Sequence, residues 1–268
     1  MIFINTWSQQ KQNHYNKYIK LYILPIIFTF GFTGNNAFKN LEIPLSTSEQ
    51  KCFIKKDIYL SINESNNLNK VEKQIFIKKI DNRLPKYIKY FKKHTRNSIF
   101  SWELIAALSY QESHWNHKAV SKTKVKGLMM LTKDTASYIG VKNRLDPNQS
   151  VYGGVKYLEN IFKRLPKSVV GSDRMWMTLA AYNVGLGHLE DARVITERFG
   201  HNPNYWSDVK KHLPLLRLKK FYKRTKYGYA RGKEPVKYVK RIQAYLNIIH
   251  EDKKTYLASL GLKKVFNK

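Results

Sequence analysis

Apolar side chains recur at three- and four-residue spacing from about residue 101 to residue 250, which is the period of an α-helix. Residues suited to begin and end helices punctuate this pattern. Ser101, Thr132 and the pair Asp146 and Pro147 stand at expected helix starts, and Gly200 stands at an expected end. Because no alternating strand pattern competes over this stretch, the sequence predicts an all-α domain.

The same signals predict where the individual helices lie. The first begins near Val71 and continues to about Phe91 with a break at Pro85, and the helix that follows Ser101 carries Glu112 and Trp115. We expect the other helices after Thr132 as far as Ile139, from Pro147 to about Leu165, from Asp173 through Tyr182, from Leu189 to Phe199 and from Pro235 to His250, with Gly185 and Gly187 as interruptions.

Residues 1–37 have the pattern of an export segment. Lys11, Lys17 and Lys20 precede an apolar run over residues 21–32, which is too short to span a bilayer comfortably. We expect either a signal peptide or a retained membrane anchor, and both place the rest of the chain outside the cytoplasm. Residues 38–70 are predicted to be a polar linker, residues 71–250 the helical domain, and residues 251–268 a basic tail.

The formal net charge of +30 suggests polyanionic surroundings. Lysine is abundant everywhere, however, including segments without a binding pattern, so we predict no nucleic-acid partner. Cys52 is the single cysteine, which excludes an intramolecular disulfide and a cysteine-based metal site. The close pair His114 and His117 has no obvious further ligands nearby, and we predict no metal and no cofactor.

Glu112 is an acid at a position where its helix should present a core side chain. With about 100° of rotation per residue, Ile105, Leu108 and Trp115 fall within about 60° of it on a helical projection. An apolar setting disfavours the charged form of a carboxyl and raises its pKa. The pattern therefore predicts a protonated acid that can donate a proton near neutral pH, which is a general acid.

Four short segments accompany this acid in a fixed order: Tyr110–Asn116, Gly127–Leu131, Ala180–Asn183 and Tyr238–Val239. Together they resemble the soluble-lytic-transglycosylase domain of glycoside hydrolase family 23, which implies a goose-lysozyme-like fold. Residues 206–210, 213–216 and 227–232 are similar to the membrane-bound F branch of the lytic murein transglycosylases. That branch carries a solute-binding-like domain ahead of the catalytic one, and we expect it to be largely absent here.

The resemblance implies a role for each matching residue. Glu112 would be the catalytic acid and base, Ser113 would steady the site, and Tyr182 would support the acid and the bound sugar. The lining of the cleft would come from Gly127, Leu128, Met129, Met130 and Asn183, and Tyr238 would close the cleft from the last helix. The turn departs from the family pattern at Lys122, Lys124 and Met130, and a lysine held at positive φ costs about 1 kcal/mol.

The reaction that the resemblance implies needs only one carboxylate. Most glycosidases use two, and we expect Asp134, Asp146 and Asp173 to be capping or first-turn residues instead. A lytic transglycosylase cleaves the β-1,4 bond between N-acetylmuramic acid and N-acetylglucosamine, and the 6-hydroxyl of the muramic acid forms a 1,6-anhydro end. The expected partner is the peptidoglycan glycan strand, in the periplasm and peripheral to the outer membrane. A lysozyme-like hydrolase and a non-catalytic cell-wall-binding module are the alternatives.

Overall fold

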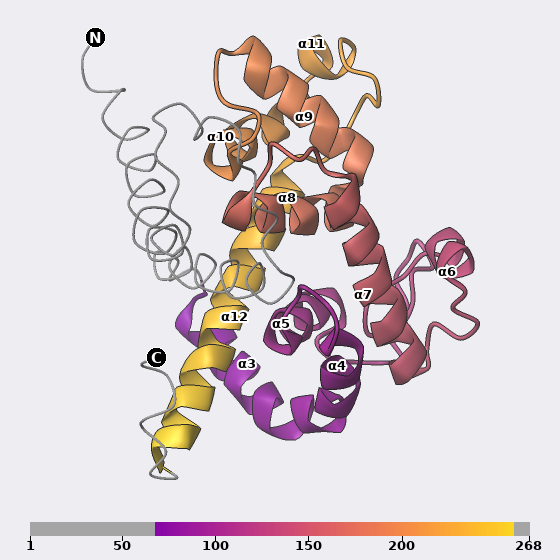
Figure 1. Ribbon diagram of the computed structural model, residues 1–268, viewed down its shortest axis with the longest axis vertical. Helices are drawn as coiled ribbons and strands as arrows, with labels where there is room; N and C mark the ends of the chain where they lie inside the picture. The colour runs from indigo at the N-terminus through magenta and orange to yellow at the C-terminus, as the bar shows by residue number, and fades with distance from the viewer. Residues whose placement is uncertain (1–67, 260–268) are drawn as a thin grey trace, which may run out of the picture. The chain divides into compact units, whose positions relative to one another are not determined.

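The computed structural model describes residues 68–259, all of which belong to the compact unit Ser46–Lys268. The predicted signal or anchor, most of the linker and the end of the basic tail lie outside the described residues. Within the described part the chain is helical, without a strand, and its only bridges are Val120 with Lys126 and Lys126 with Leu131. The all-α prediction is confirmed for these residues (Figure 1).

Ten α-helices and two 3-10 helices make up the described part. The α-helices are α3 (Lys70–Asn82), α4 (Ile88–Thr95), α5 (Trp102–Ser113), α6 (Lys133–Ile139), α7 (Pro147–Arg164), α8 (Gly171–Val184), α9 (Leu186–Arg198), α10 (Trp206–His212), α11 (Lys219–Tyr222) and α12 (Lys233–Ser259). The 3-10 helices are η2 (Leu84–Lys86) and η3 (Leu213–Arg217). None of the described helices is both long and apolar enough to cross a membrane.

Helix α5 lies at the centre of the domain. Every residue from Glu103 to Tyr110 is buried, so this helix is covered on all sides rather than along one apolar stripe. Helix α12 packs along both α5 and α8, while α4 contacts α5 and α7, as the end-on view of α5 in Figure 1 shows. Helix α5, whose last turn contains Glu112, is therefore enclosed by the helices that pack against it.

The predicted helix starts are confirmed where a polar side chain caps the helix. Ser101 accepts a hydrogen bond from the Leu104 amide, Thr132 from the Thr135 amide, and Asp146 from the Gln149 amide. Each such cap contributes about 1 kcal/mol to helix stability. The break at Pro85 is also confirmed, because α3 ends before it and η2 separates α3 from α4.

Three predicted boundaries are wrong. Helix α8 begins at Gly171, two residues before Asp173, and the Asp173 carboxylate accepts a hydrogen bond from the Trp206 amide. Helix α9 begins at Leu186 and includes Gly187, which was expected to interrupt it. Helix α12 runs from Lys233 to Ser259 and so continues nine residues beyond the expected end at residue 250, because no glycine or proline follows there to stop it.

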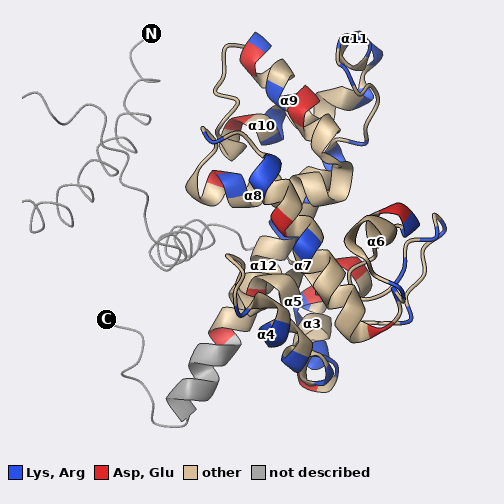
Figure 2. Ribbon diagram, turned by 45° about the vertical axis from the view of Figure 1, so that its right-hand side comes forward, with Lys and Arg blue, Asp and Glu red and all other residues tan. Residues whose placement is uncertain are grey.

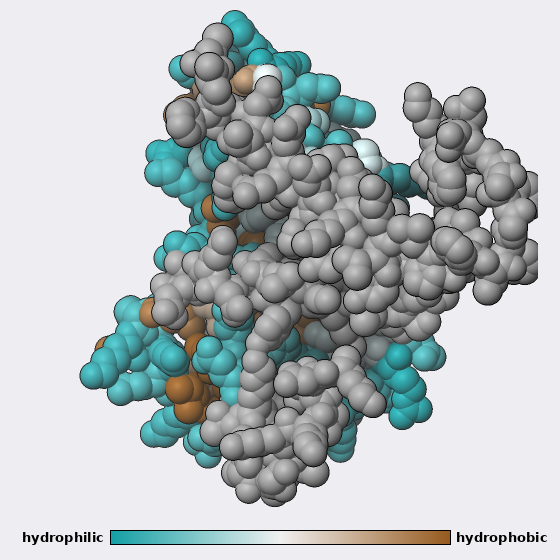
Figure 3. Space-filling model, turned by 60° about the vertical axis from the view of Figure 1, so that its left-hand side comes forward, coloured by the Kyte–Doolittle hydropathy of each residue, from teal (hydrophilic) through white to brown (hydrophobic). Residues whose placement is uncertain are grey.

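The surface of the described part is polar and basic. Lysine and arginine lie on nearly every described helix rather than on one element (Figure 2). On the face drawn in Figure 3, the visible hydrophobic residues form small patches between hydrophilic ones. The charge is therefore distributed, as the sequence suggested.

Candidate active site

Glu112 lies in the last turn of α5 and faces Tyr238 from α12. The Tyr238 hydroxyl donates a hydrogen bond to Glu112 Oε1. Protein atoms crowd the carboxyl, although the residue keeps some exposure to solvent. Burial raises the pKa of Glu112 to about 7, against the opposing effect of the Tyr238 hydrogen bond. The group is therefore close to half protonated at neutral pH and can both give and accept a proton.

Two tyrosines surround this carboxyl. Burial raises the pKa of Tyr182 and that of Tyr238 well above the ordinary value, and the charge of Glu112 adds to both shifts. Both hydroxyls therefore stay protonated near neutral pH and act as donors. The hydrogen bond to the acid comes from Tyr238, which we expected to close the cleft. The Tyr182 hydroxyl instead donates to the backbone carbonyl of Met129 at 2.8 Å.

The segment Gly127–Met130 forms a turn that hydrogen bonds hold against the neighbouring helices. The Leu128 carbonyl accepts from Ser113 Oγ at 3.0 Å and from Ser109 Oγ at 3.1 Å, both on α5. The Met129 amide donates to Ser150 Oγ of α7 at 3.2 Å. Ser113 thus connects the turn to the helix that carries Glu112.

Glycine is required at position 127. Its φ is +87°, and a Cβ atom there would lie 1.8 Å from the Arg144 carbonyl oxygen. Met130 (φ 46°) and Lys124 (φ 61°) also adopt positive φ, whereas Lys122 is not among the residues that do. The cost expected at the two lysines therefore applies at Lys124 only.

Asn183 lies exposed in the last turn of α8, and Met130 is partly exposed beside the buried Gly127, Leu128 and Met129. Hydrogen bonds thus join Glu112 to Tyr238, Ser113 to Leu128 and Tyr182 to Met129. Asn183 follows Tyr182 on α8.

Trp115 does not lie where the helical projection placed it. Helix α5 ends at Ser113, and His114 and Trp115 have positive φ values of 52° and 54°. The buried indole turns back, donates from Nε1 to the Ala106 carbonyl at 2.9 Å and packs on Tyr110 with ring centroids 4.8 Å apart. Tyr110 is two residues from Glu112 and so points to roughly the opposite side of α5. Ile105 and Leu108 are fully buried as expected.

Comparison with known proteins identifies the domain. The family model described as Transglycosylase SLT domain matches residues 89–203. Membrane-bound lytic murein transglycosylase F of Saccharophagus degradans is 54% identical over 175 residues, which cover 65% of this chain and 35% of that protein. The protein of the same name from Shewanella halifaxensis is 53% identical over 67% of this chain and 37% of its own length.

This chain is similar to transglycosylase SLT-domain proteins over residues 89–203. It spans little more than a third of the length of the curated relatives it matches. The match over 89–203 contains Glu112, the turn, Tyr182 and Asn183, whereas Tyr238 lies beyond it.

Two solved structures match this chain at lower sequence identity. The 70 kDa soluble lytic transglycosylase of Escherichia coli gives a TM-score of 0.40 at 18% identity, covering 78% of this chain and 31% of that one. A complex of the 70-kDa soluble lytic transglycosylase with bulgecin A gives 0.46 at 20% identity, covering 77% and 31%. Both TM-scores lie below 0.5, so the description of the fold relies on the helices given above and not on these two structures.

Arg241, which sequence reasoning missed, fixes α12 beside the acid. It lies three residues after Tyr238 and donates from Nε to Gln111 Oε1 at 3.2 Å, from Nη1 to Glu72 Oε1 at 2.7 Å and from Nη2 to the Tyr245 hydroxyl at 2.6 Å. The spacing from Tyr238 shows that both side chains share a face of α12. The partners on α3 and α5 are more than a hundred residues away in sequence, and no local pattern indicates them.

Among the described residues, no second carboxylate shifts the pKa of Glu112. Asp146 caps α7 and Asp134 lies in the first turn of α6, in keeping with their expected structural roles. The described part of the chain also contains no group of three or more His, Cys, Asp or Glu side chains that could hold a metal ion. The chemistry available at this site is that of one carboxyl and two tyrosine hydroxyls.

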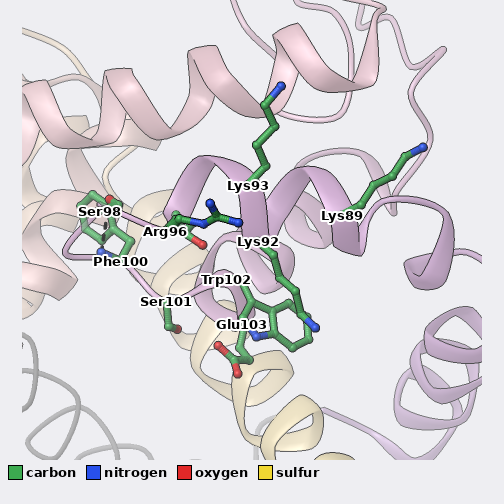
Figure 4. Close-up of a pocket in the computed structure, with 10 residues that line it drawn as sticks. Lys89, Lys92, Lys93, Arg96, Ser98, Phe100, Ser101, Trp102 and Glu103 are labelled. Carbon is green, nitrogen blue, oxygen red and sulfur yellow. Dashed lines mark hydrogen bonds between the residues drawn. The ribbon is translucent and has the colours of Figure 1, made fainter.

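A separate hollow of about 490 Å³ lies between α4 and the start of α5 (Figure 4). Four basic residues, Lys89, Lys92, Lys93 and Arg96, are among those that line it. None of the four pairs with an acidic residue in the described part of the SLT domain. The Lys92 ammonium lies 5.6 Å from the centroid of the Trp102 ring. The hollow contains none of the predicted site residues.

Proposed function

We propose that this chain is a peptidoglycan lytic transglycosylase. Its substrate is the β-1,4 bond between N-acetylmuramic acid and N-acetylglucosamine, and its product carries a 1,6-anhydromuramic acid end. The observation that carries the proposal is a crowded Glu112 carboxyl with a pKa of about 7, hydrogen-bonded by Tyr238 and without a second carboxylate in its described surroundings. The family match and the relatives' names support the same activity.

The reaction proceeds in two proton transfers through Glu112. The protonated carboxyl gives its proton to the glycosidic oxygen as the bond from the muramic C1 to that oxygen breaks. The resulting carboxylate then takes the proton of the muramic 6-hydroxyl as O6 bonds to C1. Glu112 ends protonated again and no water is consumed. The Tyr238 hydroxyl stabilises the carboxylate between the steps, because a hydrogen bond to a charged acceptor is stronger than one to a neutral acceptor.

The remaining residues hold the turn beside Glu112 in shape. Ser113 and Tyr182 fix the carbonyls of Leu128 and Met129, so that the turn presents a defined surface to the sugar. Preorganisation of this kind reduces the entropic cost of substrate binding. Asn183 is exposed and Met130 and Tyr182 are partly exposed, so these residues of the group can contact the substrate directly.

Product analysis tests the reaction. Purified peptidoglycan digested by the full chain should release muropeptides lighter by one water molecule than hydrolytic products, as mass spectrometry measures. Glu112→Gln, which keeps the size of the side chain but cannot cycle a proton, should still bind and release nothing. Reducing termini instead of anhydro ends would make the chain a lysozyme-like hydrolase. Binding without any release from the wild type would make it a cell-wall-binding module.

We further propose that the domain works in the periplasm, peripheral to the outer membrane. The relatives are named membrane-bound, and residues 1–37 have the pattern of a signal peptide or anchor. The four basic residues that line the α4 hollow would be attracted by phosphate groups of lipid headgroups. Flotation of the chain with anionic vesicles, and its loss in the triple Lys89→Gln, Lys92→Gln, Lys93→Gln variant, would support this location; unchanged flotation would contradict the role of the hollow.

A further inference from the structure

The segment between α11 and α12 presents two exposed aromatic rings. Tyr227 is 52% exposed and Tyr229 is 56% exposed, although they are separated by a single glycine. Single exposed aromatic residues are ordinary on a protein surface, whereas several that lie together can mark a binding site. Tyrosine suits such a patch because its ring is apolar and its hydroxyl forms hydrogen bonds.

A buried carboxylate holds this segment in place. Asp191 of α9 is only 3% exposed, and both of its oxygens accept backbone hydrogen bonds, from the Lys226 amide at 3.0 Å and from the Tyr227 amide at 2.8 Å. At the other end of the segment the Ala230 amide donates to the Leu216 carbonyl at 3.2 Å. The two tyrosines are therefore presented by a fixed backbone, and binding through them would order little additional chain.

The segment is attached to α9, which lies near α11 in Figures 1 and 2. Arg198 at the end of α9 donates to the Arg224 carbonyl at 3.0 Å, and Asp191 holds the next residues. At the start of α9, a Cβ atom on Gly187 would lie 2.6 Å from the Tyr227 ring. The ring thus lies directly on the first turn of α9.

That turn follows the Tyr182 and Asn183 end of α8 with only Val184 and Gly185 between Asn183 and the first residue of α9. Tyr227 consequently contacts the part of α9 that directly follows the end of α8 carrying Tyr182 and Asn183. The contact also explains the glycine within α9, since a larger residue at position 187 would displace the ring.

We propose that Tyr227 and Tyr229 form a binding platform for the pyranose rings of the peptidoglycan strand, adjacent to the Glu112 site. The platform rests on the proposed function, which supplies the glycan. An aromatic face packs against the C–H face of a sugar, while tyrosine hydroxyls pair with sugar hydroxyls. The Lys226 ammonium, 5.5 Å from the Tyr227 ring centroid, adds a positive charge that suits the carboxylates of the peptide stems.

Sedimentation with purified peptidoglycan sacculi tests the platform. The full chain carries Glu112→Gln throughout, so that binding is measured without cleavage, and each measurement is made at low and at high salt. Replacing both tyrosines by alanine should weaken binding by at least about fivefold at either salt concentration, as loss of central aromatic contacts does at other interfaces. Replacing both by phenylalanine should retain most of the affinity because the rings remain.

Tyr138→Ala is the matched control, since Tyr138 on α6 is 77% exposed but does not belong to this segment. It should bind as the parent does, and thermal melting should show that all variants are folded. If the double alanine variant binds as well as the parent, the platform is refuted. It is also refuted if the double alanine variant loses binding at low salt but not at high salt. Absence of binding by the parent also refutes it.

The platform and the proposed function fail in different ways. If the chain with Glu112 restored releases anhydro products, but replacing both tyrosines by alanine does not weaken binding, the platform alone is refuted. Binding that depends on the tyrosines, without any anhydro product from the wild type, would refute the reaction and leave the platform supported.

Discussion

Tyr238→Phe should raise the pKa of Glu112 and move the alkaline limit of activity upward. The variant removes the hydroxyl that donates to Glu112 Oε1 and leaves the ring. That hydrogen bond favours the carboxylate and lowers the pKa, against the larger effect of burial, which brings it to about 7. Its loss therefore favours the protonated form. Because the reaction begins with protonated Glu112, activity falls as pH rises through this pKa, and the fall should occur at higher pH in the variant.

The size of the effect follows from the strength of the bond. A hydrogen bond to a charged group contributes about 1.5–3 kcal/mol, and 1.36 kcal/mol corresponds to a tenfold change in the ionisation equilibrium. The alkaline limit should therefore rise by about one to two pH units. The maximal rate should fall as well, because the carboxylate formed in the first step loses its donor.

The assay is release of anhydromuropeptides from sacculi, followed by mass spectrometry over a range of pH on both sides of neutrality. Tyr245→Phe is the matched control. It also removes a tyrosine hydroxyl from α12, but this hydroxyl contacts Arg241 and not Glu112. Its alkaline limit should stay at the wild-type position. A Tyr238→Phe profile that superimposes on the wild-type profile would show that the observed contact does not control the ionisation of the acid.

Three further predictions concern stability. Folded Glu112 binds its proton more tightly than the unfolded chain does, with a pKa of about 7 against 4.5, so stability falls as pH rises between these values. Glu112→Gln should remove this pH-dependent loss of stability. It should raise the free energy of unfolding by at most about 3 kcal/mol above pH 7 and by little below pH 4.5. Urea unfolding titrations at both pH values measure the difference. Gly127→Ala should lower the melting temperature by an amount equivalent to at least about 2 kcal/mol, since its Cβ would strike the Arg144 carbonyl; calorimetry showing no decrease would contradict the geometry of the turn. Asp191→Ala should lower the free energy of unfolding by about 2–4 kcal/mol, because the Lys226 and Tyr227 amides lose their acceptor. A protease should then cut the segment between α11 and α12 faster than it does in the wild type.

Local chemistry made part of this structure predictable. A cap such as Ser101, Thr132 or Asp146 acts on an amide three residues away, so the sequence contains both partners and the helix starts follow from it. The position of Glu112 as a crowded acid in a helix could be inferred in the same way, and burial does raise its pKa. Helix ends were less predictable: the projection of Trp115 assumed that α5 continued, whereas two residues with positive φ end it.

The partners of the acid were decided by tertiary packing. Tyr238 reaches Glu112 across 126 positions of sequence, and Arg241 reaches Glu72 across 169, because α12 packs along α5 and α3. Periodicity tells which side chains share a face of one helix but not which helix that face meets. The sequence could therefore name the acid and its motifs, and only the fold decided that Tyr238 donates to the carboxyl while Tyr182 holds the turn.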